Sequence, residues 1–199
     1  MTRQKIVNKQ IEIHNCKEIG NKSPSFFFQK GKGVSSKILI LGESLPKNGW
    51  MDSGKAFYAK EDKLAPTGKK LNEELAVLNL SVEDCSFTEI AKCYIGSNRK
   101  ILKPCGLLCG EHLFSQIKHY KIRLILSLGV ITKDILEKLF GIHLAMGEIN
   151  QANHKDKKFF ILPLYHPSPA SPYGHKRNLN IIRINKKGIK NVLTKKNSN

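Results

Sequence analysis

Two short apolar runs, each followed at once by a cluster of polar residues, constrain the fold of this chain most. The first run is Lys37–Leu41, followed by Gly42–Ser44, and the second is Ile161–Tyr165, followed by His166–Ser171. Open α/β sheets bind their ligands beyond the carboxyl ends of the strands, where strand ends and helix N-termini converge. We therefore expect the two polar clusters to meet in one active site built from two loops.

The rest of the chain alternates short apolar runs with amphipathic stretches. Strands are expected at 38–41, 86–91, 124–128 and 159–164, and helices at 69–78, 106–120 and 132–140. Strands separated by helices predict a central, mostly parallel sheet covered on both faces, which is a three-layer α/β/α fold. The length of 199 residues fits one domain. Within it, we expect the basic tail Lys186–Asn199 to fray.

Several motifs, taken in order, resemble those of the uracil-DNA glycosylase superfamily. The loop Gly42–Pro46 resembles the Gly-Glu-Ala-Pro-Gly loop of that family, and His166–Ser168 matches its His-Pro-Ser loop. Between them, Gly54–Phe57 and Gly68–Leu75 resemble segments of the family, and Phe87–Cys93 and Asn98–Arg99 resemble a stretch of its iron–sulfur-containing branch. The resemblance covers roughly residues 37 to 180. It implies a monofunctional DNA glycosylase, which hydrolyses the N-glycosidic bond of uracil or a related damaged or deaminated base in base excision repair.

The resemblance implies catalytic roles for Glu43, Ser44 and His166. Glu43 would orient water and offset the positive charge that develops at C1′ of the sugar. Ser44 occupies the position of the general-base Asp of the fastest family members, and a hydroxyl is a poor base near neutral pH. We therefore expect slower chemistry led by Glu43. His166 would donate a hydrogen bond to O2 of the base as negative charge accumulates there.

Two residues are predicted to bind the base. Phe57 follows Gly54 where the family has a stacking Phe, with Tyr58 as the alternative if the register slips by one. Glu89 stands where the family has an Asn that reads uracil. An ionised carboxylate has only acceptors, so it would meet N3–H but repel O4, unless burial raises its pKa and keeps it protonated. An ionised Glu89 in the pocket therefore predicts that uracil is a poor substrate. A surface position at a strand end is the alternative.

The second loop and the overall charge both indicate DNA as the partner. Ser168 is expected to bond a phosphate, Tyr173 to fill the space left by a flipped base, and Lys176 and Arg177 to clamp flanking phosphates. The family places its DNA-wedging loop at 171–178. With 34 Lys and Arg against 16 Asp and Glu, the formal net charge is +18. Such a charge attracts polyanions, although a generally Lys-rich proteome is an alternative source. We expect a monomer.

No run of about 18 apolar residues predicts a membrane span, and the segment 1–5 lacks the apolar core of a signal peptide. The chain is therefore expected to be cytoplasmic, with its five cysteines as thiols or metal ligands rather than disulfides.

The resemblance implies that no cofactor takes part in the chemistry, and it makes Cys16, Cys93 and Cys109 candidate ligands of a structural 4Fe–4S cluster. Four thiolates normally hold such a cluster, so the fourth ligand would come from Cys85 or Cys105, or from a nitrogen of His14. Buried thiols that pack as small apolar groups are the alternative.

Two other functions stay open from the sequence. One is a catalytically weak nucleic-acid-binding module on the same scaffold, in which Ser44 and Glu89 mark lost chemistry. The other is an enzyme that handles a free base or nucleotide. Release of a base from a lesion-bearing oligonucleotide separates the glycosylase from both, and the sequence does not name the lesion.

Overall fold

The computed structural model describes residues 23–44, 50–59, 62–92, 95 and 99–194. A six-stranded sheet lies at its centre, in the order β1-β3-β2-β4-β6-β5. The four central strands run parallel to one another, and the edge strands β1 and β5 are antiparallel to their neighbours. The bounds are β1 Phe28–Gln29, β2 Ile38–Ser44, β3 Ser86–Ala91, β4 Leu124–Leu128, β5 Asn150–His154 and β6 Lys157–Leu164.

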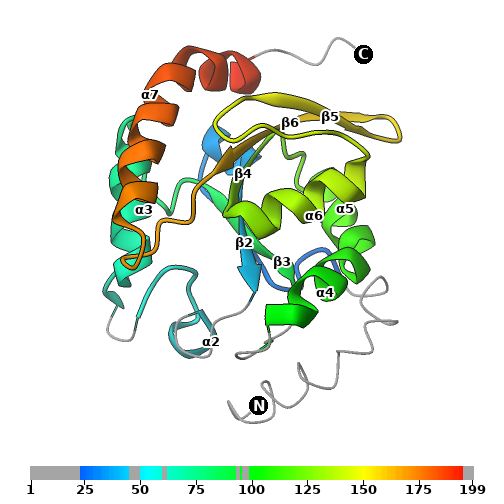
Figure 1. The fold of residues 1–199 in the computed structure, drawn as a ribbon, viewed down its shortest axis with the longest axis horizontal. Coiled ribbons are helices and arrows are strands. Elements are labelled where there is room, and N and C mark those ends of the chain that lie inside the picture. Colours follow the sequence, from blue (N-terminus) through cyan, green and yellow to red (C-terminus); the bar gives the residue numbers. More distant parts are fainter. Residues whose placement is uncertain (1–22, 45–49, 60–61, 93–94, 96–98, 195–199) are drawn as a thin grey trace.

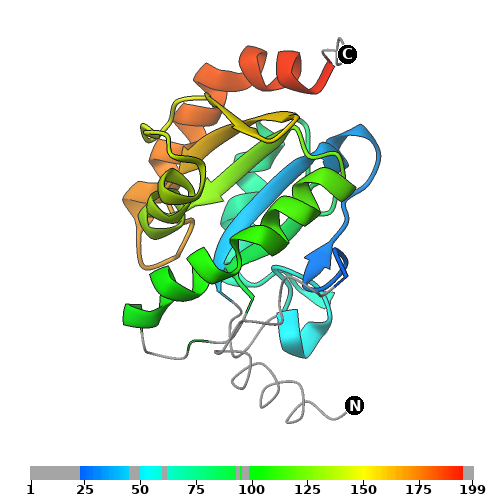
Figure 2. The same ribbon diagram turned by 90° about the vertical axis from the view of Figure 1, so that its right-hand side faces the viewer.

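Helices cover both faces of this sheet, which confirms the predicted three-layer α/β/α fold (Figure 1). Helices α4, α5 and α6 lie on one face, with α4 and α5 seen in front of the sheet in Figure 2, and α3 and α7 lie on the other face. The bounds of the α-helices are α2 Trp50–Ser53, α3 Pro66–Ala76, α4 Leu102–Leu108, α5 Gly110–His119, α6 Val130–Phe140 and α7 Pro172–Thr194. Short 3₁₀ helices are η3 Val34–Lys37 and η5 Arg99–Ile101.

The central strands are buried over most of their length because both of their faces are covered, and most of their buried residues are apolar. In β2, Leu39 and Leu41 enter the core under α4, α5 and α6, whereas Ile38 and Ile40 enter the core under α3 and α7. This alternation is the two-residue period of a strand. The predicted strands at 86–91 and 124–128 have the observed bounds.

Three local features differ from the sequence prediction. The helix expected at 106–120 is two helices that meet at Cys109. Strand β5 was not predicted, because it is a polar edge strand in which only Ala152 is buried. The expected frayed tail is wrong for Lys186–Thr194, which belong to α7. Ile182 and Ile189, two helical turns apart, are both buried and hold this helix on the core.

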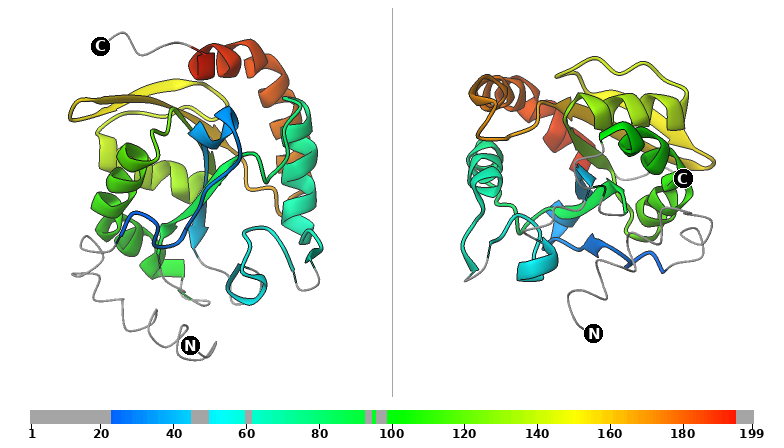
Figure 3. Two further views of the ribbon diagram at one scale, coloured as in Figure 1. Left: turned by 180° about the vertical axis from the view of Figure 1, so that it is seen from behind. Right: turned by 60° about the horizontal axis from the view of Figure 1, so that its bottom comes forward.

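The fold places the carboxyl ends of β2, β3, β4 and β6 along one edge of the sheet. In Figure 1 the arrowhead of β2 points to the lower side of the molecule, and the right panel of Figure 3 turns this side toward the viewer. Glu43 and Ser44 end β2, Gly129 follows β4, and His166 follows β6. The polar clusters predicted from the sequence therefore lie at the same edge.

Candidate active site at the carboxyl edge of the sheet

Glu43 and His166 approach each other at Gly129, the residue that precedes helix α6. A Cβ atom added to Gly129 would lie 3.0 Å from Glu43 Oε1 and 3.6 Å from His166 Cβ. Gly129 also has a φ of +92°, and its N–H donates to Leu164 O at 2.8 Å. Only a glycine fits this backbone conformation without strain. Gly129 thus lets the two predicted catalytic side chains share one space above the ends of β4 and β6.

Arg99, from the short helix η5, holds the carboxylate of Glu43. Its Nη2 atom lies 2.5 Å from Glu43 Oε2, and the Arg99 side chain is 55% exposed whereas that of Glu43 is 15% exposed. The Asn98–Arg99 motif was part of the family resemblance, but no role had been assigned to Arg99. A charge-assisted bond orients the carboxylate at the sheet edge and leaves Oε1 toward Gly129.

His166 is a neutral imidazole near pH 7. Burial is the largest cause that lowers the pKa of His166 below the usual 6.5. The negative charge of Glu43 raises this pKa, and the positive charge of Arg99 lowers it further. A neutral imidazole can still donate one N–H hydrogen bond. This protonation state suffices for the predicted role at the departing base.

Glu89 lies inside the protein, so the alternative of a surface position is wrong. Glu89 is 6% exposed, and it pairs in register with Gly42 on β2. A Cβ atom on Gly42 would lie 2.1 Å from Glu89 Oε2, so the carboxyl group occupies the space that the glycine leaves open. Burial is the largest cause that raises the pKa of Glu89 well above 4.5; Lys92 lowers it and Glu43 raises it. Of the two forms that the sequence left open, burial thus favours the neutral acid over the carboxylate.

Phe57 lies on the same face of the sheet as Glu89. Its ring packs edge-on against Phe87 with centroids 4.4 Å apart, and Phe87 precedes Glu89 by two residues on β3. The turn that carries Phe57 is held close to helix α3, where a Cβ on Gly68 would lie 2.5 Å from Phe57 O. The hydroxyl of the alternative, Tyr58, instead donates to Glu83. Phe57 is the aromatic side chain placed beside the predicted base reader.

Tyr173, Lys176 and Arg177 lie in the first turns of helix α7 rather than in the DNA-wedging loop expected at 171–178, and Ser168 precedes the helix. The helix begins at Pro172. Proline is favoured at the first helical position because an N–H there would have no intrahelical partner, so its absence costs nothing. Tyr173 is 78% exposed, and Lys176 is also exposed. Arg177 lies over the ring of Tyr165, 5.2 Å from its centroid. Ser168 Oγ accepts from Ala170 N at 3.2 Å and so closes its own turn.

Ser44 is the last residue of β2 and pairs in register with Ala91. It is partly exposed at the same sheet edge as Glu43. Its neighbours in the chain at 45–49, including Pro46 of the family motif, lie outside the described residues. The structure therefore gives the position of Ser44 at the sheet edge, but it shows no hydrogen bond from the Ser44 hydroxyl to another described residue.

A buried polar network behind His166 was not found from the sequence. The Asn178 side chain accepts from Tyr165 N–H and donates to Tyr165 O, both at 2.8 Å, and it also donates to both carboxyl oxygens of Glu74 at 3.1 Å. Glu74 is 0% exposed and lies 2.9 Å from His175 Nδ1. Asn178 thereby fixes the backbone of the residue that precedes His166. A single polar residue in a helix carries no sequence signal for such a long-range contact.

The predicted cluster ligands lie only in part within the described residues. Among the three predicted cluster ligands, Cys16 and Cys93 lie outside the described residues, and Cys109 is fully buried between α4 and α5. Cys109 Sγ accepts a hydrogen bond from Lys92 N at 3.4 Å, so the chain just before Cys93 lies against it. Within the part of the chain that the structure describes, no group of three or more His, Cys, Asp or Glu side chains could hold a metal ion.

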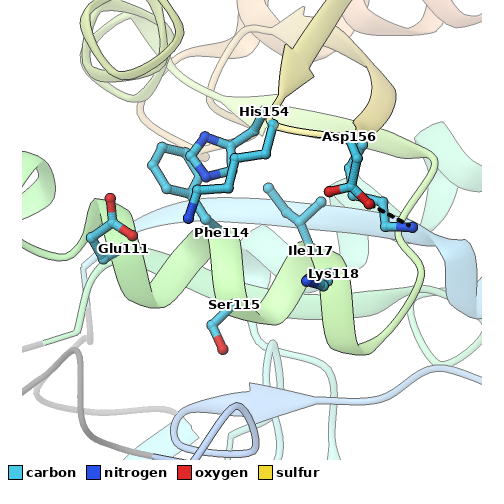
Figure 4. A pocket seen from close by; sticks show the side chains of 9 residues that line it. Glu111, Phe114, Ser115, Ile117, Lys118, His154 and Asp156 are labelled. Atoms are coloured by element: carbon cyan, nitrogen blue, oxygen red, sulfur yellow. Dashed lines mark ion pairs between the residues drawn. The ribbon is translucent and has the colours of Figure 1, made fainter.

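A separate surface groove lies between helix α5 and the hairpin of β5 and β6 (Figure 4). The rings of Phe114 and His154 stack at 3.7 Å in its wall. The groove lies at the amino end of β6, opposite the end that leads to His166, and it contains none of the predicted site residues. Its lining residues are Glu111, Phe114, Ser115, Ile117, Lys118 and His154–Lys157.

The fold and the strand-end residues define an α/β protein whose reactive groups come from loops that follow parallel strands. The family model described as the uracil DNA glycosylase superfamily matches residues 28–187, and the chain belongs to this superfamily. All six strands of the sheet and most of α7 lie within the matched residues.

Three curated relatives are each named type-4 uracil-DNA glycosylase. The protein from Saccharolobus solfataricus is 30% identical over 146 residues, covering 70% of this chain and 65% of that protein. The protein from Archaeoglobus fulgidus is 24% identical over 163 residues, covering 79% and 78%. The protein from Sulfurisphaera tokodaii is 29% identical over 142 residues, covering 66% and 64%. The chain thus spans just under two thirds of the first and third relatives. No described helix is long and apolar enough to cross a membrane.

Proposed function

We propose that this protein is a monofunctional DNA glycosylase that removes uracil or a related deaminated base from DNA in base excision repair. The observation that carries the proposal is the meeting of Glu43 and His166 at Gly129, with Glu89 and Phe57 one strand away. The names of the relatives and the family membership support the same activity. We propose that it acts as a monomer in the cytoplasm.

Glu43 leads the chemistry on the sugar. A carboxylate beside C1′ offsets the positive charge of an oxocarbenium-like transition state and orients the attacking water. The bond from Arg99 at 2.5 Å keeps the carboxylate in one orientation. Because the Arg99 side chain is half-exposed, the energy of this pair is reduced by solvent, and its role is mainly to position Glu43. Ser44 adds no strong base near neutral pH.

His166 stabilises the departing base. Its neutral imidazole donates a hydrogen bond toward O2 of the base, and this bond strengthens as negative charge develops there. Burial, which lowers the pKa of His166, keeps the imidazole neutral beside Glu43. A neutral donor has the further advantage that it does not form an ion pair that would draw Glu43 away from the sugar.

The base reaches this site by flipping out of the DNA stack. A base inside a duplex cannot meet Glu43 and His166 at once, so the nucleotide must rotate into the protein. Phe57 then stacks on the base, a contact worth about 1–3 kcal/mol, and Glu89 reads its edge. Tyr173, exposed at the start of α7, has the size to fill the vacated space.

DNA binds across the carboxyl edge of the sheet. Lys176 and Arg177 project from the first turns of α7, and Gly174 in the same turns lies close to His166 O, where its Cβ would be 3.1 Å away. Phosphate contacts at this position set the register of the DNA on the site without reading its sequence. Ser168 contributes through its hydroxyl hydrogen, since its oxygen already accepts from Ala170.

We further propose Cys16, Cys93 and Cys109 as ligands of a structural 4Fe–4S cluster, with Cys105 as the fourth. Cys105 is one helical turn before Cys109, whose N–H donates to Cys105 O at 3.0 Å. Burial raises the pKa of Cys85 to about 12, which disfavours the thiolate that a ligand needs. Protein purified without oxygen should contain about four irons and lose them in Cys109→Ser but not in Cys85→Ser. Iron-free wild-type protein would contradict the cluster.

The activity is tested with a panel of oligonucleotides that each carry one lesion. The wild type should leave abasic sites that break only after alkali or heat. Glu43→Gln and His166→Ala should each lower the single-turnover rate by roughly 10²–10³ with little change in DNA affinity. Glu111→Gln and His154→Ala in the distal groove are matched controls and should keep the wild-type rate. Salt-sensitive binding without any abasic product would instead favour the nucleic-acid-binding module.

A further inference from the structure

The carboxyl group of Glu89 is buried in the position of a ligand-reading group, yet one of its two oxygens lacks a hydrogen-bond partner among the described residues. Among the described residues, Glu89 Oε2 has no hydrogen-bond partner although the residue is 6% exposed. Buried polar atoms are almost always paired. An unpaired oxygen of this kind, beside Phe57 and one strand from Glu43, indicates that the partner is supplied by the substrate.

The surroundings of Glu89 favour its neutral form. Lys92 is the cation nearest in the chain, but its ammonium donates to Thr88 Oγ1, Glu89 O and Gln116 Oε1. These three contacts take up every N–H of an ammonium, and burial lowers the pKa of Lys92 to about 7. Lys92 therefore has no N–H left for the Glu89 carboxyl group and carries only part of its positive charge near pH 7. The negative charge of Glu43 acts from the end of β2. No salt bridge to Glu89 forms among the described residues, and a buried carboxylate without one is costly.

A neutral carboxylic acid presents one donor and one acceptor side by side. Uracil offers N3–H and O4, which the acid meets by accepting with C=O and donating with O–H. Cytosine offers the reverse order, N3 as acceptor and N4–H as donor. The acid meets this edge too when its proton moves to the other oxygen. An amide has its donor and acceptor fixed on different atoms, and must rotate by half a turn to make the same exchange.

Resting on the glycosylase function proposed above, we infer that Glu89 reads the flipped base as a neutral acid and that the pocket binds bases with one donor beside one acceptor in either order. The pocket thus takes uracil without the repulsion expected of a carboxylate. It also binds cytosine at this edge, so discrimination against cytosine falls on the chemical step. Gly42 is a positioning residue for this reader, because any side chain there would occupy the space of the Glu89 carboxyl group.

Two substitutions of similar size test whether the neutral acid reads the base. Glu89→Gln keeps a donor beside an acceptor and should excise uracil at pH 7 within about 5-fold of the wild type. Glu89→Leu removes both and should lose roughly 10-fold or more. A Gln variant more than about 10-fold faster than the wild type would show that Glu89 is ionised in the active protein. A Leu variant with the wild-type rate would show that Glu89 does not read the base.

The order of donor and acceptor is tested by binding without cleavage. Duplexes carry 2′-fluoro-deoxyuridine or 2′-fluoro-deoxycytidine opposite thymine, so that neither base has a Watson–Crick partner and the fluorine suppresses bond cleavage. The wild type should bind the two within about 3-fold, and Glu89→Asn should prefer uracil by roughly 10-fold. A wild-type preference for uracil of roughly 10-fold or more overturns the inference. Because these affinities need no turnover, they remain informative if the lesion panel shows no excision and the glycosylase proposal fails.

Discussion

Glu74 should make the stability of this protein depend on pH in a window where few side chains titrate. The carboxyl group is 0% exposed between α3 and α7, with His175 and Asn178 as its hydrogen-bond partners. Burial is the largest cause that raises its pKa from 4.5 to about 7, and these two partners only partly oppose it. Glu74→Gln keeps the shape of the side chain and removes the titration.

The magnitude follows from linkage between proton binding and folding. A pKa raised from 4.5 to about 7 corresponds to about 3.4 kcal/mol at about 1.36 kcal/mol per pH unit. The folded state binds the proton more tightly than the unfolded chain does, so protonation of Glu74 raises the free energy of unfolding. Its contribution is fully present below pH 4.5, is lost as the pH rises through about 7, and stays lost above that value. Glu74 thus destabilises the protein at pH 8 relative to pH 4.5.

Urea unfolding of the wild type and Glu74→Gln at about pH 5 and about pH 8 measures this effect. The free energy of unfolding of the wild type should fall relative to that of the variant by about 2–3 kcal/mol between the two pH values. All other titrating groups are shared, so they cancel in this comparison. Glu111→Gln, an exposed carboxylate on α5, is the control and should show no such difference. An equal difference between wild type and Glu74→Gln at both pH values would refute a protonated, buried Glu74.

Three further predictions concern the function. Asn178→Asp should slow base excision at about pH 8 roughly 10-fold, because a carboxylate cannot donate to the backbone that precedes His166 and repels Glu74, which is ionised above about pH 7. Adding Glu74→Gln should recover part of the rate at this pH, and a double mutant slower than Asn178→Asp would contradict this coupling. Arg99→Ala should lower the single-turnover rate by roughly 10-fold at nearly unchanged DNA affinity, and a loss of affinity alone would reassign Arg99 to phosphate binding. Lys176→Gln should reduce the salt dependence of DNA binding by about one counterion, whereas Lys118→Gln in the distal groove should leave the slope unchanged.

The core and the carboxyl edge of the sheet were predictable because they depend on local patterns. Strands covered on both faces are rich in apolar residues, so β3 and β4 are visible as runs of five or six residues. The residue that follows such a strand must lie at the sheet edge, which places Glu43 and His166. Strand β5 and the last turns of α7 were missed for the opposite reason. Each has a mainly polar surface, and the few buried residues that anchor it are recognised only against the rest of the core.

The sequence proposed the residues of the candidate site but not their protonation states. Glu89 was predicted to read the base, yet its ionisation depends on burial that no local pattern shows. Gly42 pairs with Glu89 across the two strands and leaves room for its carboxyl group, and the burial of that group favours the neutral acid. The proposed substrate range changes with it, from a pocket that repels uracil to one that accepts it.

The amino-acid sequence by itself therefore determines the parallel sheet, its carboxyl edge and the side chains that end its strands, because a strand's period and apolarity are properties of neighbouring residues. Only the tertiary structure decides which charges meet there. Arg99 contacts Glu43 across 56 residues of sequence, and Asn178 contacts Glu74 across 104. Such contacts, and the desolvation that sets the protonation of Glu74, Glu89 and His166, arise only when distant segments pack together and exclude water.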